Sequence, residues 1–401
     1  MPLKDALPTQ GRFSQWRPNW VILTLGLAML AAVWGLPTVS VAANRIVSGT
    51  GYPVWQALSW GGGILASVII LAMTVLASQP ERTRLNYIAQ VAALVLLLLL
   101  MPFGLMAASH WLVDGAQPQA RLGIGPAYWV VMFLALLGLV ELRLCLSLAR
   151  GWMALLLVGI GAVWWGCAAF WLESLALVQE FQTREEQFYQ ALRQHLALVT
   201  IAVSVSIVLG MGIALLMRRF HRLQRGGFAL LNFFQTVPSL ALFGLLLAPL
   251  AWLSANVPFA AQLGIKGIGW TPALIALIIY SLLPIVRNTY VALEAVSPDV
   301  LDAATGMGMR NSQRFWQVRV PLALPILLEG VRITMVQAIG LTAVAALIGA
   351  GGLGAFIFQG LGQAAMDMVL LGALPILVMA LAADAGIGAL AAQLRRGAAY
   401  D

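Results

Sequence analysis

Charged residues are scarce in this chain. Only 9% of its 401 residues are Asp, Glu, Lys or Arg, whereas 61% are hydrophobic. An average soluble domain carries about 25% charged residues, and so few charges cannot cover a globular surface in water. The composition therefore excludes a soluble enzyme, and the high hydrophobicity excludes a disordered chain. Because the apolar runs are continuous and not alternating, they favour a helical membrane protein over a barrel.

Lysine, cysteine and histidine are also rare, and each shortage excludes a kind of site. Lys4 and Lys266 are not followed by Ser or Thr, so no phosphate-binding loop of the G-x-x-x-x-G-K-[ST] kind is present. Cys145 and Cys167 show no disulfide or zinc spacing and are expected to pack as small apolar residues. The three histidines form no metal cluster. We expect no cofactor, no metal site and no covalent chemistry, so the chain is not expected to be an enzyme.

Long apolar runs fill most of the sequence. A membrane-spanning helix needs about 20 mainly apolar residues. Ten segments meet this requirement: 20–40, 58–77, 87–107, 126–142, 152–172, 196–217, 228–251, 268–286, 320–345 and 366–390. The sequence therefore predicts an all-α fold, a polytopic transmembrane helical bundle.

The basic residues indicate an orientation. If both chain ends are cytoplasmic, 17 of the 23 Lys and Arg residues fall in cytoplasmic segments and five fall outside, with Arg332 inside a helix. Cytoplasmic loops of membrane proteins carry such an excess. We therefore expect a multi-pass protein of the bacterial inner membrane with cytoplasmic N- and C-termini. Its net charge of +8 then reflects basic loops beside membrane lipid, and no nucleic-acid partner is expected.

The chain changes character between residues 180 and 195. Residues 1–180 are apolar, rich in tryptophan and without an evident motif, and they predict an N-terminal extension of about five transmembrane helices. The polar segment 181–195 predicts an amphipathic connector on the outside. Residues 196–390 predict a core of about five helices with prolines inside apolar runs, and 391–401 a cytoplasmic tail.

The loop between the eighth and ninth apolar segments is the most informative part. Ser297-Pro298 predicts a helix start, with Ser as N-cap and Pro at the first helical position. Gly308 predicts a left-handed helix end. Asn311 or Ser312 is expected to cap a second helical piece. The small residues and flanking arginines suit the docking of a partner, although an ordinary amphipathic surface helix would show the same pattern.

The spacing in this loop resembles the EAA loop of ABC importer permeases. In this chain Asp302-Ala-Ala is followed, after three residues, by Gly and, after nine more, by Val-x-Val-Pro. The family has Glu-Ala-Ala, Gly and Ile-x-Leu-Pro at the same offsets. The three departures are conservative. In the family this helix inserts into the ATP-binding subunit and couples hydrolysis to gating. The resemblance assigns that coupling role to Asp302, Ala303, Ala304, Gly308 and Pro321.

The resemblance extends over residues 190–390. Within that family the chain is similar to the osmoprotectant branch, which imports glycine betaine, carnitine, choline or proline betaine. The segments that carry it include Phe233–Leu242, Pro284–Tyr290, Gly306–Met309, Pro321–Pro325 and Ala346–Gly354. It implies a type I ABC importer permease core preceded by about five extra transmembrane helices. The implied partners are ABC ATPase subunits, a second permease copy or paralogue, and a periplasmic or extracellular substrate-binding protein that selects the substrate.

The expected function is therefore that of a permease subunit for glycine betaine or a related compatible solute, driven by a separate ATPase. A permease for an amino acid such as methionine is the main alternative. An ion-coupled secondary transporter would need acidic residues near the midplane and repeated halves, neither of which is evident. A structural subunit remains an alternative for the first five helices.

Polar residues inside the apolar core segments are candidates for the translocation path. Gln235, Thr236, Pro238 and Ser239 interrupt the seventh segment, and Gln337 lies in the ninth. Polar groups are costly in a bilayer, and backbone freed by proline must be satisfied by protein or by a water-filled path. A kink satisfied by neighbouring helices would explain the same residues.

Five charged residues also lie inside the predicted spanning segments, Glu141, Glu329, Arg332, Asp367 and Asp384. Glu329 and Arg332 stand three residues apart and can pair on one helix face. We expect a structural ion pair near the cytoplasmic end, and not a gate. Asp384 is placed near the inner interface and is assigned no role.

Gly349, Gly351, Gly352 and Gly354 match the dinucleotide pattern G-x-G-x-x-G by letter alone, because no strand precedes them. We expect a flexible outside turn that closes the outer mouth or meets a docking protein, with close helix packing as the alternative. Most of the 14 tryptophans lie at segment ends, as in an interfacial aromatic belt. That belt is the preferred explanation over an aromatic cage for a quaternary ammonium group.

Overall fold

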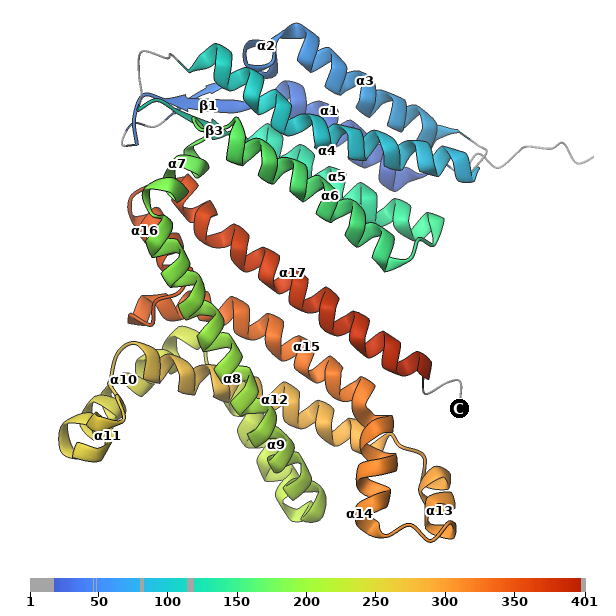
Figure 1. Ribbon diagram of the computed structural model, residues 1–401, viewed down its shortest axis with the longest axis vertical. Helices are drawn as coiled ribbons and strands as arrows, with labels where there is room; N and C mark the ends of the chain where they lie inside the picture. The colour runs from blue at the N-terminus through green and yellow to red at the C-terminus, as the bar shows by residue number, and fades with distance from the viewer. Residues whose placement is uncertain (1–17, 46, 48, 80–82, 114–118, 398–401) are drawn as a thin grey trace, which may run out of the picture. The chain divides into compact units, whose positions relative to one another are not determined.

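The computed structural model describes residues 18–45, 47, 49–79, 83–113 and 119–397 (Figure 1). The chain forms two units, Met1–Gln182 and Thr183–Asp401. Nine helices among the described residues are long and apolar enough to cross a membrane. The predicted helical membrane bundle is therefore confirmed, with one small β-sheet as an exception.

The first unit is a helical bundle with a three-stranded antiparallel sheet at one end (Figure 1). The strands run in the order β2-β1-β3, and Val39 of β1 stands opposite both Tyr52 and Ile124. A core of buried leucines, methionines and alanines lies between the helices. The elements are α1 (Trp20–Gly35), β1 (Val39–Ala42), β2 (Thr50–Tyr52), α2 (Val54–Ala57), α3 (Ser59–Ser78), α4 (Arg84–Leu112), β3 (Arg121–Ile124), α5 (Pro126–Leu146), α6 (Arg150–Phe170) and α7 (Ala176–Thr183).

The sheet corrects the first predicted spanning segment, 20–40. Helix α1 has 16 residues and ends at Gly35, so it is shorter than each of the nine helices that are long enough to span a membrane. Pro37 follows, and proline lacks the amide hydrogen that would continue a helix. The β-branched residues Val39 and Val41 then favour an extended strand. Residues 36–40 therefore do not continue the helix, and β1 begins at Val39.

Glu180 ties α7 to the sheet end of the first unit. Its carboxylate is 3% exposed, and Oε1 accepts from Arg121 Nη1 at 2.6 Å and from Arg45 Nε at 2.8 Å. Arg121 begins β3, while Arg45 follows β1. A buried carboxylate needs such partners, because the loss of its hydration would otherwise be uncompensated.

The second unit is helical throughout its described residues (Figure 1). Helix α12 packs against α8 and α15, and α15 packs against α17. The elements are α8 (Glu185–Arg219), α9 (His221–Thr236), α10 (Ser239–Asn256), α11 (Pro258–Gln262), α12 (Trp270–Glu294), α13 (Pro298–Gly306), α14 (Asn311–Gln313), η1 (Arg314–Arg319), α15 (Val320–Ala345), η2 (Ala346–Ile348), α16 (Gly354–Gly362) and α17 (Met366–Gly397).

Two helices of the second unit differ from the predicted segments. Residues 185–195, expected in an outside connector, are the first turns of the 35-residue helix α8. Glu185 and Glu186 in its first turn suit the positive end of the helix dipole, and no proline or glycine separates them from the apolar part. The predicted segment 228–251 is not one helix, because α9 ends at Thr236 and α10 begins at Ser239.

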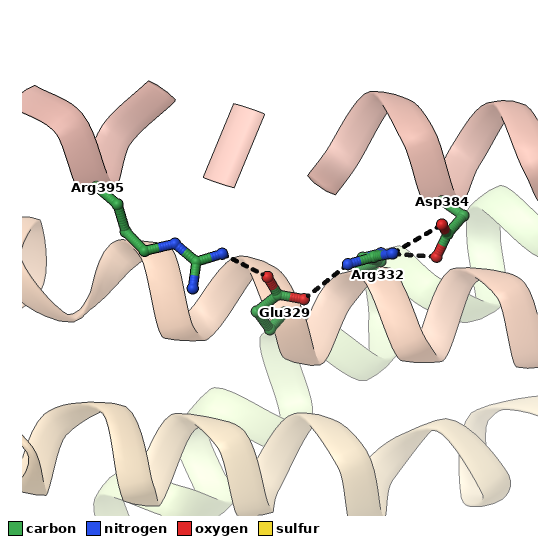
Figure 2. A network of polar contacts seen from close by, with 4 residues as sticks. All are labelled: Glu329, Arg332, Asp384 and Arg395. Atoms are coloured by element: carbon green, nitrogen blue, oxygen red, sulfur yellow. Dashed lines mark hydrogen bonds and ion pairs between the residues drawn. The ribbon is translucent and has the colours of Figure 1, made fainter. Parts of the chain in front are cut away.

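A chain of four charged side chains joins α15 to α17 (Figure 2). Arg332 binds Asp384 through two hydrogen bonds, Nε–Oδ1 at 2.6 Å and Nη2–Oδ2 at 2.7 Å. It also reaches Glu329 at 3.3 Å, and Glu329 accepts from Arg395 at 2.8 Å. The expected Glu329–Arg332 pair is present, but the shorter and bidentate contact goes to Asp384, to which we assigned no role. Charges of alternating sign inside spanning helices compensate one another in a medium that solvates them poorly.

Replacing Glu180 by Gln should destabilise the first unit. Two arginines would then face a neutral amide, and removing one partner of a buried ion pair costs about 3 kcal/mol. We expect a lower melting temperature of the detergent-solubilised chain, measured by nanoscale fluorimetry. The matched control is Glu173→Gln, because Glu173 is an exposed carboxylate of the same unit. Equal melting temperatures for the two variants would show that the Glu180 contacts add nothing.

A double-mutant cycle on Arg332 and Asp384 should reveal a favourable coupling. Arg332→Met and Asp384→Leu each leave an unmatched charge between α15 and α17, whereas the double variant leaves none beyond Glu329 and Arg395. Groups in direct contact couple by about 0.5–3 kcal/mol. The double variant should therefore unfold in detergent at a higher temperature than the two single losses predict. Strictly additive losses would contradict a direct pair.

Candidate functional site

Helix α13 is the core of the candidate coupling loop, and its two ends are built as the sequence predicts. Ser297 is the N-cap, and its hydroxyl accepts from the Asp299 amide at 3.3 Å. At the other end Gly308 has φ +81°, the Met309 amide donates to the Ala304 carbonyl and the Gly308 amide donates to Thr305. These two bonds form a Schellman motif, which requires a left-handed residue at Gly308.

The faces of α13 differ in what they contact. Leu301 is buried against the end of α12 and the start of α15, and Ala304 is buried as well. Val300, Ala303 and Met307 are exposed, and Met307 has 73% of its surface accessible. Their spacing of three and four residues places them on one helix face. We call Val300, Ala303 and Met307 the outward face of α13.

The residues assigned to coupling therefore occupy different positions. Asp302, Ala303 and Gly308 are exposed on or beside α13, and Pro321 is exposed in the first turn of α15. Ala304 is 1% exposed, so it packs inside the loop and does not present a surface. The sequence analysis missed Val300 and Met307, although their helical spacing with Ala303 would have revealed a common face.

The second helical piece of the loop, α14, has a different N-cap from the predicted one. Its N-cap is Arg310 and not Asn311 or Ser312, and the Arg310 amide donates to Gln313 Oε1 at 2.8 Å. Arg314 then bridges the two pieces, because its guanidinium donates to Thr305 Oγ1 at 2.7 Å. From Arg314 to Arg319 the backbone is π-helical before it continues as α15. Such stretches often mark functional positions in helices.

The path candidates surround the break between α9 and α10. Val237 is extended there, with φ −68° and ψ 128°. Tyr280 of α12 donates its hydroxyl to the Val237 carbonyl, and Gln235 Nε2 donates to the Tyr280 carbonyl at 2.5 Å. Thr236 donates to the carbonyl of Phe233 at 2.7 Å. The freed backbone is thus satisfied by α12, as a membrane-embedded break requires.

The five path candidates come from the α9–α10 break and from α15. Gln235, Thr236, Pro238 and Ser239 lie together at the break, while Gln337 is half-buried on α15. Sequence analysis missed Tyr280. Its phenol within an apolar helix was the available signal, since a buried tyrosine hydroxyl usually finds a partner.

The glycine turn that follows η2 is packed closely against α8. Gln194 Oε1 accepts from the Gly352 amide at 3.2 Å, and a Cβ built on Gly351 would meet the same oxygen at 2.2 Å. A Cβ on Gly354 would lie 1.9 Å from the Ala343 carbonyl oxygen. Gly349, Gly351 and Gly352 also have positive φ. The glycines are therefore needed for close approach and for backbone shape, as the alternative of close helix packing expects.

A polar cleft of about 190 Å³ lies beside this turn. Glutamines 187, 190 and 194 of α8 line one side, and Phe356 and Gln359 of α16 line the other. The turn and the α13 loop stand at opposite ends of α15, which has 26 residues. At 1.5 Å per residue these ends are about 39 Å apart, enough to separate two faces of a bilayer. Among the described residues, no group of three or more His, Cys, Asp and Glu residues could hold a metal ion.

Comparisons with known proteins match both units. Residues 206–396 match the family described as binding-protein-dependent transport system inner membrane component. Residues 17–178 match the N-terminal domain of the ABC transporter permease YehY. The extension and the core thus each have a separate counterpart.

Individual relatives match about half of this chain. The osmoprotectant import permease protein OsmW of Salmonella typhimurium is 39% identical over 48% of this chain and 84% of its own length. The carnitine transport permease protein OpuCB of Listeria monocytogenes is 34% identical over 54% of this chain and 91% of its own length. The ergothioneine transport permease/ergothioneine binding protein EgtU of Helicobacter pylori is 36% identical over 46% of this chain and 31% of its own length. The chain therefore belongs to the family of binding-protein-dependent ABC transport permeases that includes the osmoprotectant importers.

Proposed function

We propose that this chain is the permease subunit of an ABC importer that moves glycine betaine or a related compatible solute across the bacterial inner membrane. The observation that carries the proposal is the similarity to OsmW, an osmoprotectant import permease, over 84% of that relative. A carnitine permease is also among the relatives. These names favour compatible solutes over methionine, the main alternative.

The energy for transport comes from separate ATPase subunits that dock on the α13 loop. Support comes from the outward face, where Val300, Ala303 and Met307 leave apolar surface exposed beside Asp302. An exposed apolar strip on a short, well-capped helix suits insertion into a cleft of a partner. The excess of basic residues on this side of the spanning helices favours a cytoplasmic position for the loop and for both chain ends.

A substrate-binding protein delivers the solute at the other end of α15. Support comes from EgtU, whose name combines a permease with a binding protein, and from the family description, which includes binding-protein dependence. The glycine turn and the glutamine-lined cleft offer polar groups on a closely packed surface there. Docking at this surface would put the binding protein and the ATPase subunits at opposite ends of α15, a helix about 39 Å long.

The solute crosses beside the break between α9 and α10, in a path completed by a second permease copy or a paralogue. Support comes from the irregular backbone at Val237, because non-helical backbone at membrane depth is tolerated where it is buried in protein or lines a water-filled cavity. Thr236 and Pro238 are exposed at this break, and Gln235 and Ser239 are half-buried. Gln337 on α15 is the fifth candidate for the lining.

The α13 loop can be tested by combining Asp302→Lys with Gly308→Val. Lysine reverses the charge beside the outward face, and a β-branched residue strains the left-handed position that the Schellman motif needs. We expect loss of ATPase-subunit co-purification and at least a tenfold fall in solute uptake. Gly308→Asn alone is the matched control, because asparagine tolerates positive φ. If co-purification and uptake persist unchanged in the double variant, the coupling assignment is wrong.

The substrate class can be tested in proteoliposomes that contain this chain with its ATPase subunits and binding protein. We expect ATP-dependent uptake of radiolabelled glycine betaine that excess carnitine or choline inhibits and excess methionine does not. Omitting the ATPase subunits should abolish the uptake, since this chain lacks a phosphate-binding loop. Uptake driven by an ion gradient without ATP would instead indicate a secondary transporter.

A further inference from the structure

The first unit contains an apolar cavity of about 270 Å³. Its walls come from α3, α4 and α5, with Val33 of α1 and Val54 of α2 at the edge. Gly104 of α4 allows the close approach of Tyr128, because a Cβ there would lie 2.5 Å from Tyr128 Oη and 3.3 Å from Leu58 Cδ2. The cavity is many times larger than a single water needs, and its walls are almost entirely carbon.

Two residues with a side-chain hydroxyl, Tyr128 and Thr38, line this cavity, and one of the two hydroxyls lacks a hydrogen-bond partner among the described residues. Tyr128 Oη donates to the Met101 carbonyl at 3.1 Å. Thr38 is 4% exposed, and its buried Oγ1 has no hydrogen-bond partner among the residues that the structure describes. The Thr38 backbone is fully used, because its amide donates to Tyr52 and its carbonyl accepts from Gly125. A fixed, buried and unpaired hydroxyl is costly, so it points to a ligand that accepts or donates at this position.

The cavity is bordered by apolar side chains that are exposed on the spanning helices of the first unit. Leu65 of α3 and Phe103 of α4 line it, and they are 52% and 41% exposed. A water-soluble ligand would have to cross hydrocarbon to enter between them. Trapped water is also disfavoured, because it needs two to four polar partners and this cavity offers one free hydroxyl.

The Thr38 hydroxyl and the apolar walls are arranged like the polar and apolar parts of a lipid molecule. Thr38 lies just before β1, at the sheet end of the unit, and Ile69 lies three turns along α3 from Leu58. Near that end Trp34, Trp55 and Trp60 cluster, with ring centroids 6.0–6.2 Å apart. Tryptophans gather at the level of the headgroups, so Thr38 lies near the depth of the lipid ester groups.

We propose that this cavity binds one acyl chain of a membrane phospholipid, with an ester oxygen accepting a hydrogen bond from Thr38 Oγ1. The chain fills the apolar space between α3, α4 and α5, and the headgroup stays at the tryptophan level. The N-terminal unit thereby carries a lipid site that is separate from the transport function of the second unit.

The test uses the full-length chain, purified in mild detergent with phosphatidylethanolamine that carries a diazirine on its acyl chain. Irradiation followed by peptide mass spectrometry should place crosslinks in α3, α4 and α5 at the cavity. Native mass spectrometry should show one phospholipid retained per chain. Ala66→Phe fills the cavity, because Ala66 lines it, and should abolish both signals.

The Thr38→Val variant distinguishes a hydrogen-bonded lipid ester from a lipid that only packs in the cavity. It should lower lipid retention about 3- to 10-fold, the value of one hydrogen bond. In delipidated protein it should raise the melting temperature, because the unpaired hydroxyl is gone. The matched control is Thr74→Val, since Thr74 is a buried threonine of the same unit whose hydroxyl already donates to Ile70 at 2.7 Å. Crosslinks that miss these three helices, or equal retention by wild type, Ala66→Phe and Thr38→Val, would overturn the proposal.

Discussion

Hydrocarbon offers no hydrogen bonds, and the rest of this structure depends on that constraint. Helices meet it along most of the chain, since each amide finds its carbonyl within the same segment. Where the helix stops at Val237, side chains of another helix take over. The Tyr280 hydroxyl donates a hydrogen bond to the Val237 carbonyl, and the Gln235 side chain donates one to the carbonyl of Tyr280. A candidate path with irregular backbone can therefore exist only because α12 supplies its partners.

The same constraint explains how the few charges are used. Arg332 lies inside a spanning helix, and it contacts Asp384 and Glu329 together. Glu180 is buried in the first unit between two arginines. Four buried side-chain atoms lack a hydrogen-bond partner among the described residues: Thr38 Oγ1, Gln90 Oε1, His195 Nδ1 and Arg319 Nε. Thr38 is the one of these four residues that lines the apolar cavity, where we propose that a lipid supplies the partner.

The two ends of α15 show two ways of making a rigid surface. At the α13 loop, Ser297 and Gly308 close the helix ends, and the buried Leu301 packs against α12 and α15. At the glycine turn, positive φ angles and close contact with Gln194 shape the backbone. Both surfaces are thus preorganised, which lowers the entropic cost of binding a partner.

The sequence by itself determined the class of protein, the place of most spanning helices and the caps of α13. Composition, apolar length and cap chemistry act over a few neighbouring residues, so they can be read locally. It misjudged residues 36–40 because hydrophobicity alone does not separate a buried strand from a helix end. Only the tertiary structure decided which polar groups meet. Asp384 stands 52 residues from Arg332, Tyr280 stands 43 from Val237, and Arg121 stands 59 from Glu180. Such contacts depend on how whole helices and strands rotate and pack against one another, and no local pattern records that.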